Sequence, residues 1–165
     1  MHHIKPLSEY KVLARMVQRI VSGGQTGADR AALDWAMQHG IPHGGWCPHG
    51  RRAEDGRIAD RYLLQETESP DYAQRTAWNV RDADGTVIFS LTPNLGEGSE
   101  LTRRMAEQYH KPHLHLHPGS AQPAATLLRF LHEHDIRVLN IAGPRASTEP
   151  AVGAFVTEVL DAALG

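Results

Sequence analysis

The chain has 165 residues, which fits one compact domain, and its 41% of hydrophobic residues can form a buried core. A net charge of −2 argues against broad binding to nucleic acids or anionic membranes, and no apolar run is long enough to span a membrane. A single cysteine excludes an intrachain disulfide and, with no signal-peptide pattern at the start, favours a cytoplasmic protein.

Helical and strand-like patterns alternate along the sequence. An N-terminal extension over 1–16, with a short predicted helix over 7–16, precedes a single domain over 17–165. The expected strands are short apolar or alternating runs at 17–22, 44–47, 63–64, 86–89, 113–117 and 138–142. The expected helices each have one apolar face and lie at 28–39, 70–84, 99–109, 123–134 and 150–164.

Strands that alternate with helices favour right-handed crossovers and an α/β fold with a doubly wound, mostly parallel sheet. In the strand order 3-2-1-4-5-6, the order reverses between the first and fourth strands, here 17–22 and 86–89. Ligands bind at such a reversal, beyond the carboxyl ends of the strands, and a glycine-rich loop follows each of these two strands. The strand order and the loops therefore predict a ligand site at the same edge of the sheet.

The first glycine-rich loop, Ser22-Gly-Gly-Gln-Thr-Gly-Ala-Asp-Arg30, joins a strand to a helix and predicts an anion site. Its glycines permit close backbone approach, and the free N–H groups of the helix would point at the anion. Thr26 can cap the helix or bind a phosphate oxygen, and Arg30 can pair with the anion. A tight turn without a ligand is the alternative, because neither G-x-G-x-x-G nor a Walker A motif is present. The candidate ligand-binding residues here are Gly23, Gly24, Gln25, Thr26, Gly27 and Arg30.

The second loop, Leu95-Gly-Glu-Gly-Ser-Glu-Leu-Thr102, offers Gly96, Gly98 and Ser99 as ligand-binding donors at another helix start. Glu97 and Glu100 suit a helix N-terminus but would repel a nearby phosphate. They could instead bind ribose hydroxyls, hold a metal or act as a general base, or Glu97 could simply face water.

Further candidates lie outside the glycine loops. Glu54, in a polar loop over 48–60, can orient a ligand, whereas Arg51 and Arg52 in the same loop are expected to face solvent. Arg75 and Asn79 lie four residues apart on one helix and can face the crevice together. Fourteen of the 17 basic residues are arginine, which suits phosphate recognition, although a GC-rich genome gives the same bias.

Other features carry less weight. The segment Asn140-Ile-Ala-Gly-Pro-Arg145 is a weaker site candidate, because its strand is expected to lie further from the reversal of strand order. His113, His115 and His117 share one strand face, but an edge strand explains this alternation, and no metal site is predicted. Cys47 is expected to be a small buried residue.

Several motifs together resemble one known family, the molybdenum cofactor carriers. They are Ser22–Arg30, Gly44-Gly-Trp-Cys-Pro48, Ala53-Glu-Asp-Gly56, Gln74-Arg-Thr76, Asn79-Val-Arg-Asp-Ala-Asp-Gly-Thr86 and Ala142-Gly-Pro-Arg145. The family is related to the lysine-decarboxylase-like, or cytokinin-activating phosphoribohydrolase, group. The resemblance, over about residues 17–164, implies a Rossmann-like three-layer sandwich and a pocket for a phosphorylated ligand. It also implies a homodimer or homotetramer. Both the molybdenum cofactor and a nucleotide are candidate ligands.

One departure bears on catalysis. The phosphoribohydrolases carry P-G-G-x-G-T-x-x-E, and Thr102 stands where their catalytic glutamate would be. Glu100 lies about 200° around the helix from that position and cannot simply replace it. The leading hypothesis is therefore a protein that binds a phosphorylated nucleotide-like or molybdopterin-type ligand. The alternatives are a nucleotide phosphoribohydrolase or N-glycosidase that uses Glu100 or Glu97, and a regulatory nucleotide sensor.

Overall fold

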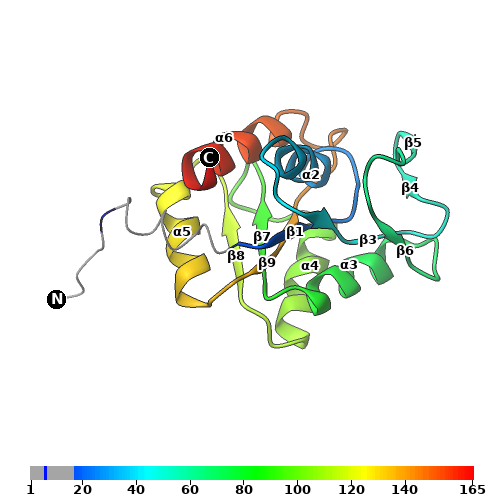
Figure 1. Ribbon diagram of the computed structural model, residues 1–165, viewed down its shortest axis with the longest axis horizontal. Helices are drawn as coiled ribbons and strands as arrows, with labels where there is room; N and C mark the ends of the chain where they lie inside the picture. Colours follow the sequence, from blue (N-terminus) through cyan, green and yellow to red (C-terminus); the bar gives the residue numbers. More distant parts are fainter. Residues whose placement is uncertain (1–5, 7–16) are drawn as a thin grey trace.

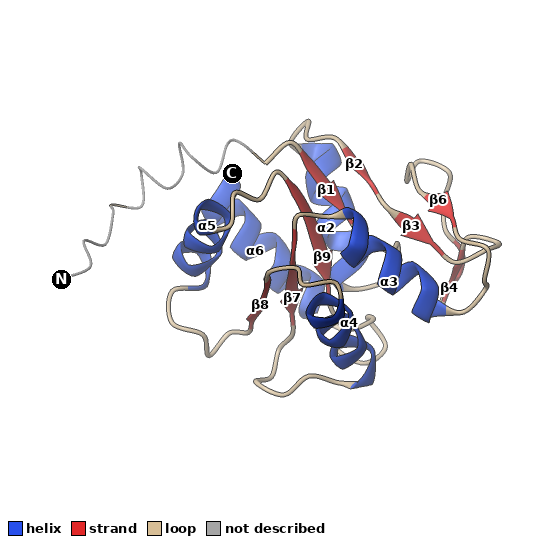
Figure 2. Cartoon of the chain, turned by 90° about the horizontal axis from the view of Figure 1, so that it is seen from below, coloured by secondary structure: helices blue, strands red, loops and turns tan. Residues whose placement is uncertain are grey.

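The computed structural model describes Pro6 and residues 17–165, so the helix predicted over 7–16 lies outside the described residues. A central sheet lies between two layers of helices (Figures 1 and 2). The helices are α2 (Ala28–Gln38), α3 (Tyr72–Asp82), α4 (Glu97–Gln108), α5 (Pro123–Glu133) and α6 (Val152–Leu164). The strands are β1 (Arg19–Val21), β2 (His43–Gly44), β3 (Trp46–Cys47), β4 (Arg52–Ala53), β5 (Gly56–Arg57), β6 (Gln65–Glu66), β7 (Gly85–Phe89), β8 (His113–Leu116) and β9 (Val138–Ala142).

The main sheet has five parallel strands in the order β2-β1-β9-β7-β8. The predicted order, with the last strand at the far edge, is wrong, because β9 pairs with both β1 and β7. Leu139 lies opposite Ile20 of β1, and Asn140 lies opposite Thr86 of β7. Leu139 and Ile141 are fully buried, as expected of a central strand. The apolar pattern of this segment indicates burial but does not say which neighbours the strand has.

The observed order is a doubly wound order in which the chain begins at a different strand. If β9 is counted first, then β1, β2, β7 and β8 follow as the second to fifth strands, and the sheet reads 3-2-1-4-5. The order therefore reverses between β9 and β7. Ligands of doubly wound sheets bind at this reversal, so the loop after β9 gains the position that the sequence assigned to the loop after β1.

Helices cover both faces of the sheet, with α2, α5 and α6 on one side and α3 and α4 on the other (Figure 2). The helix α2 buries Ala28, Ala32, Trp35 and Ala36, which are the residues that the helical periodicity placed on one face. The helix α6 packs against α2 and α5, and its Phe155 meets Phe89 of β7 edge to face, with 5.8 Å between ring centroids.

The segment between β2 and α3 forms a small lobe beside the sheet. The predicted strand over 44–47 is split at Gly45, whose φ of 124° turns the chain away, so that β3 pairs with β6. The strand predicted over 63–64 is wrong, since the paired residues are 65–66 and Leu63 is 68% exposed. The polar loop contains the antiparallel hairpin β4–β5.

Arg51 stabilises this lobe from inside. Its side chain is buried, contrary to the expectation that it faces solvent, and its guanidinium donates to the carbonyl oxygens of Ile58, Ala59 and Tyr62. With the carbonyl of Leu64, at 3.3 Å, four backbone acceptors compensate the loss of hydration at a buried guanidinium.

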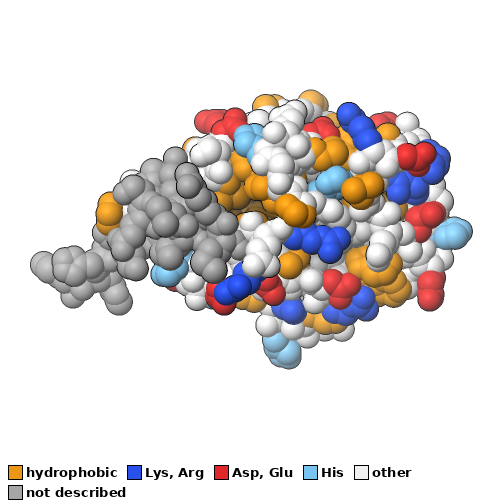
Figure 3. Space-filling view, viewed as in Figure 1, with side chains coloured by type: hydrophobic (Ala, Val, Ile, Leu, Met, Phe, Trp, Pro, Cys, Tyr) orange, Lys and Arg blue, Asp and Glu red, His pale blue; other side chains and the backbone are white. Residues whose placement is uncertain are grey.

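The outer surface mixes side chains of both charges. On the face in Figure 3, Lys and Arg side chains of the described residues lie among Asp and Glu side chains. None of the helices in the described part of the chain has the length and apolar character that a membrane crossing requires.

Candidate functional site

A cavity of about 540 Å³ opens beyond the carboxyl ends of β1, β9 and β7, which is a size typical of small-molecule sites. Its walls come from the first glycine loop, α3, the start of α4 and the loop between β9 and α6. The cavity thus lies where the strand order reverses.

The cavity gathers a subset of the residues predicted to bind a ligand. The predicted residues that line it are Gly23, Gln25, Arg75, Asn79, Gly96, Glu97, Gly98 and Ser99. The predicted residues outside its lining are Gly24, Thr26, Gly27, Arg30, Glu54 and Glu100. Both glycine loops therefore reach the cavity, although not every residue in them does.

Backbone donors of the first glycine loop are already engaged within the protein. The N–H of Gln25 donates to Asp29 Oδ2 at 3.2 Å, and that of Thr26 donates to Gln25 Oε1 at 3.0 Å. The N–H of Ala28 donates to the carbonyl of Pro144 at 3.3 Å. The carboxylate of Asp29 thus lies where the sequence predicted a bound anion.

Asp29 forms a buried ion pair with Arg75. Arg75 Nη1 lies 3.2 Å from Asp29 Oδ2 and 3.1 Å from the carbonyl oxygen of Gly23, and only 11% and 8% of the two side chains is exposed. Burial raises the pKa of the Asp29 carboxyl, and the positive charge of Arg75 opposes that rise. Asp29 was not predicted as a site residue, and its only signal in the sequence is an acidic residue in the first turn of a helix.

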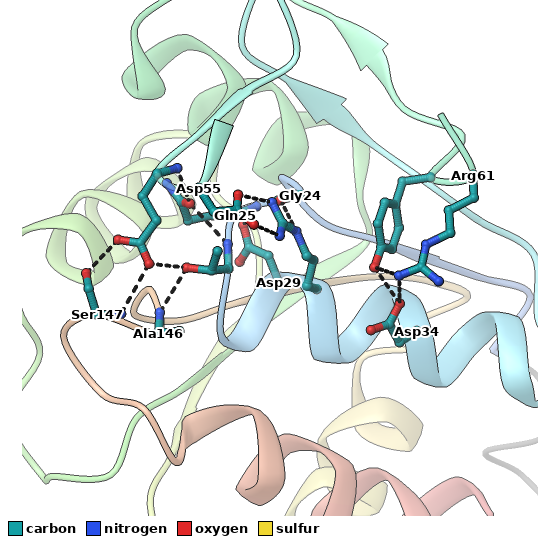
Figure 4. A network of polar contacts seen from close by, with 12 residues as sticks. Gly24, Gln25, Asp29, Asp34, Asp55, Arg61, Ala146 and Ser147 are labelled. Atoms are coloured by element: carbon teal, nitrogen blue, oxygen red, sulfur yellow. Dashed lines mark hydrogen bonds and ion pairs between the residues drawn. The ribbon is translucent and has the colours of Figure 1, made fainter. Parts of the chain in front are cut away.

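A loop clamp formed by Thr26, Glu54, Ala146 and Ser147 joins three segments (Figure 4). The hydroxyl of Thr26 donates to Glu54 and accepts from the N–H of Ala146 at 3.0 Å. Glu54 also accepts from the N–H and the hydroxyl of Ser147, at 3.1 and 2.5 Å. These bonds, those from Ser147 first, lower the pKa of Glu54. The hydroxyl of Thr26 therefore neither caps α2 nor remains free for a phosphate.

Arg30 is held away from the cavity. Its guanidinium pairs with Asp55 of the β4–β5 turn at 2.5 and 2.8 Å, and its Nε donates to the carbonyl of Gly24 at 3.1 Å. The predicted pairing of Arg30 with a ligand anion thus gives way to an ion pair between two loops. Gly27, with a φ of 81°, has a similar structural role, because an added Cβ would lie 2.6 Å from the carbonyl oxygen of Pro144.

Gln25 carries an unpaired buried donor. Its Oε1 accepts from the N–H groups of Thr26 and Glu54, at 3.0 and 2.9 Å, which fixes the orientation of the amide. Its Nε2 is buried and, within residues 17–165, has no hydrogen-bond partner. An unsatisfied buried donor costs about 1–3 kcal/mol, and Gln25 is one of the residues that line the cavity.

The start of α4 presents donors to the cavity. No side chain of the described part caps this helix, so the N–H groups of its first turn are free of side-chain partners. Gly96, Gly98 and the buried Ser99 line the cavity beside Glu97. Glu100 instead pairs with Arg103 at 2.7 Å and does not line it.

Two other polar side chains in the cavity wall are engaged by neighbouring residues. The amide of Asn79 both accepts from and donates to the backbone of Trp46, at 2.8 and 2.9 Å, and so anchors β3 to α3. The hydroxyl of Ser90 donates to the carbonyl of Thr92 at 2.6 Å and lies 2.5 Å from His115 Nε2, which must then carry the ring proton. Burial lowers the pKa of His115, which favours this neutral ring.

The loop after β9 supplies the residues that sequence reasoning undervalued. Gly143, Arg145 and Glu149 line the cavity because β9 is central rather than at an edge. Glu149 accepts from the N–H of Leu91 at 2.5 Å and joins this loop to the one after β7. The glycine and arginine at a strand end were the available signal, and the strand order was the missing information.

Metal ligands are scarce around the cavity. The described residues contain no group of three or more His, Cys, Asp or Glu that could hold a metal ion. The chain's single cysteine, Cys47, is buried and is not among the lining residues, so the cavity offers no thiolate.

The fold is a doubly wound α/β fold with a cavity of small-molecule size where its strand order reverses. The chain belongs to the circularly permutated YpsA SLOG family, whose profile matches residues 20–164. A circular permutation agrees with the position of β9, which is the last strand in the sequence but takes the place of the first strand in the doubly wound order.

A solved structure extends this relationship. The chain is 47% identical to the crystal structure named "Putative molybdenum carrier protein" from Syntrophus aciditrophicus SB, with a TM-score of 0.88. The match covers 91% of this chain and 96% of that one. The resemblance to the molybdenum cofactor carriers is thereby confirmed, as is the Rossmann-like fold. None of the curated proteins compared with the chain matches it.

Proposed function

We propose that this protein binds a small phosphorylated ligand of nucleotide or molybdopterin type in the cavity between the ends of β1, β9 and β7. The buried, unpaired Nε2 of Gln25 is the observation that carries the proposal. A fold stabilised by many internal hydrogen bonds rarely leaves such a donor unsatisfied, and a ligand oxygen would satisfy it.

The other donors around the cavity favour an anionic oxygen as that partner. Arg75 uses only Nη1 in its bonds to Gly23 and Asp29, so its Nε and Nη2 have no partner among the residues described. Ser99 and the first turn of α4 add a hydroxyl and backbone N–H groups. A phosphate at this position would interact favourably with the α4 dipole and accept charge-assisted hydrogen bonds from Arg75.

The relationship to the molybdenum carrier favours the pterin cofactor of molybdenum enzymes as a cargo for this cavity. Because no thiolate lines the cavity, the protein would hold such a cargo through its phosphate and its ring. We also propose that the protein is cytoplasmic and forms a homodimer or homotetramer. Light scattering of the purified protein would measure the size of the oligomer.

Calorimetric titration with nucleoside monophosphates and a pterin phosphate tests this proposal, using Gln25→Glu as the variant. The new carboxylate can still accept from Thr26 and Glu54 but replaces the free donor by an anionic acceptor. We expect binding to weaken at least tenfold, since one charge-assisted bond becomes a repulsion. Gln108→Glu, on an exposed position at the end of α4, is the matched control. Equal affinity of wild type and Gln25→Glu would contradict the assignment.

Hydrolysis of a nucleotide N-glycosidic bond is the second candidate function. It is favoured by the carboxylates of Glu97 and Glu149, which line the cavity in addition to Asp29, the partner of Arg75. Thr102, at the position of the missing catalytic glutamate, also lines the cavity and hydrogen-bonds the carbonyl of Gly98 at 3.2 Å. Chromatography of nucleoside monophosphates incubated with the protein separates the candidates. Release of free base would support hydrolysis, and recovery of the intact nucleotide would support binding alone or a regulatory sensor.

A further inference from the structure

Three arginines from three segments meet around one aromatic ring at the cavity. Tyr72 begins α3, and its ring centroid lies 5.4 Å from the guanidinium carbon of Arg52, 5.1 Å from that of Arg75 and 5.4 Å from that of Arg145. Tyr72, Arg75 and Arg145 line the cavity, whereas Arg52 is on β4 and outside the lining. These four residues form the arginine cluster.

The positive charge of the arginine cluster exceeds the negative charge paired with it. Asp29 pairs with Arg75, while Arg52 has only the carbonyl of Pro70, at 3.5 Å, as an acceptor. The guanidinium of Arg145 forms neither a hydrogen bond nor an ion pair within the described residues, although its charge contributes to the lowered pKa of Glu54. The oxygens of Glu54 are occupied by the loop clamp. Two guanidinium groups therefore lack a carboxylate partner at hydrogen-bonding distance.

The three guanidinium groups around the ring of Tyr72 favour a role in positioning cations over a role as a platform for a base. Aromatic side chains in nucleotide sites commonly stack on a base, which requires a free face. Here three guanidinium groups already approach a ring that has only two faces. A guanidinium over an aromatic ring keeps its N–H groups available in its own plane, where they suit the oxygens of a phosphate.

We propose that the arginine cluster is a second anion subsite, which binds the outer phosphate of a ligand carrying a diphosphate. This inference rests on the proposed function, in which Gln25, Arg75 and the start of α4 bind the first phosphate. Arg75 lines the cavity and also belongs to the arginine cluster, so the two phosphates would be adjacent, as they are in a diphosphate. The cavity would then select nucleoside diphosphates, and diphosphate-bearing ligands in general, over monophosphates.

Calorimetric titration with guanosine monophosphate and guanosine diphosphate tests this preference. We expect wild type to bind the diphosphate at least tenfold more tightly. Arg145→Gln should weaken diphosphate binding about 10- to 100-fold, the change expected for one or two charge-assisted bonds, and change monophosphate binding less than about threefold. Tyr72→Leu, which removes the ring, should weaken diphosphate binding in the same way, whereas Tyr72→Phe should not.

Arg61→Gln is the matched control, because Arg61 also lies over an aromatic ring, that of Tyr62 at 4.8 Å, but does not line the cavity. Circular dichroism of each variant establishes that it is folded. Equal affinity of wild type for the two nucleotides, or an unchanged preference in both Arg145→Gln and Tyr72→Leu, would overturn the second subsite and leave the first intact. Failure of wild type to bind either nucleotide, inorganic phosphate or pyrophosphate would overturn both proposals.

Discussion

The carboxylate of Asp29 and the guanidinium of Arg75 lie 3.2 Å apart beneath the first glycine loop, with most of both side chains buried. The pair links the start of α2 to α3, and the carboxylate also accepts from the N–H of Gln25. The carboxylate thereby satisfies a donor of the loop internally, and Nε and Nη2 of Arg75 keep no partner among the described residues. The loop is thus a support for the site as well as one of its walls.

Neutralising Asp29 should destabilise the protein more than neutralising an exposed partner. Asp29→Asn leaves Arg75 buried without its counter-charge, and we expect the free energy of unfolding to fall by about 3–5 kcal/mol in urea denaturation. Glu100→Gln removes the partner of Arg103 from a pair with side chains 39% and 40% exposed, and should cost under about 1 kcal/mol. Similar losses of stability in the two variants would show that the buried ion pair contributes no more to stability than the exposed one.

Substitution of Gly23 tests the site without backbone strain, because the φ of this residue is not positive. A Cβ at this position would overlap Arg75 Nη1, so Gly23→Ala should displace the guanidinium and weaken phosphate binding about tenfold in calorimetry. Gly24→Val is a poor probe, because the residue has a φ of 80° and an added Cβ would lie 2.7 Å from Leu64 and 2.8 Å from Ile58. We expect Gly24→Val to lower the melting temperature instead. Unaltered phosphate binding by a folded Gly23→Ala protein would show that Arg75 does not contribute to ligand binding.

The loop clamp should make stability depend on pH. The folded-state pKa of Glu54 is lowered from 4.5, so its contribution is present above that value and is lost as the pH falls through the folded-state pKa. Wild type should therefore melt at a higher temperature than Glu54→Gln at neutral pH, and the difference should shrink below about pH 4.5. Glu68→Gln, at an exposed position, should match wild type at neutral pH. A difference that stays constant from neutral to acid pH would exclude the ionised carboxylate as its source.

Because β9 lies in the middle of the sheet, shortening one of its buried side chains should destabilise the protein strongly. Ile141 of β9, the strand between β1 and β7, is fully buried, and Ile141→Ala should lower the free energy of unfolding by about 2–5 kcal/mol in urea denaturation. Leu63→Ala, at a position 68% exposed, should change it by less than about 0.5 kcal/mol. A small loss at Ile141 would be inconsistent with a strand in the middle of the sheet.

Local periodicity predicted the helices of the described chain to within a few residues and most of the main strands. Ala28, Ala32 and Trp35 recur at helical spacing because one face of α2 is buried, and this spacing is visible in the sequence. The position of β9 was not visible, since Leu139 and Ile141 would be buried beside any two neighbouring strands. Strand order depends on long-range pairing, which periodicity does not report.

The same limit applies to the site. Gln25 and Ser99 were predicted from donor chemistry in the glycine loops, and Arg75 from its place on a helix that can face the crevice. All three line the cavity. Arg30 shares that chemistry, but its partner Asp55 lies 25 residues away on a hairpin that the sequence did not predict. Arg145 was undervalued because its importance follows from the strand order. Residue type thus indicated which side chains can bind an anion, and tertiary contacts decided which of them are free to do so.

Native mass spectrometry of the purified protein, alone and with guanosine nucleotides and pterin phosphates, measures ligand binding in the cavity most directly. We predict that a phosphorylated ligand adds its intact mass to the protein and that Gln25→Glu loses this adduct. A ribose-phosphate mass left after release of the base would show an enzyme instead of a binding protein. No added mass with any of these ligands would contradict the proposed site.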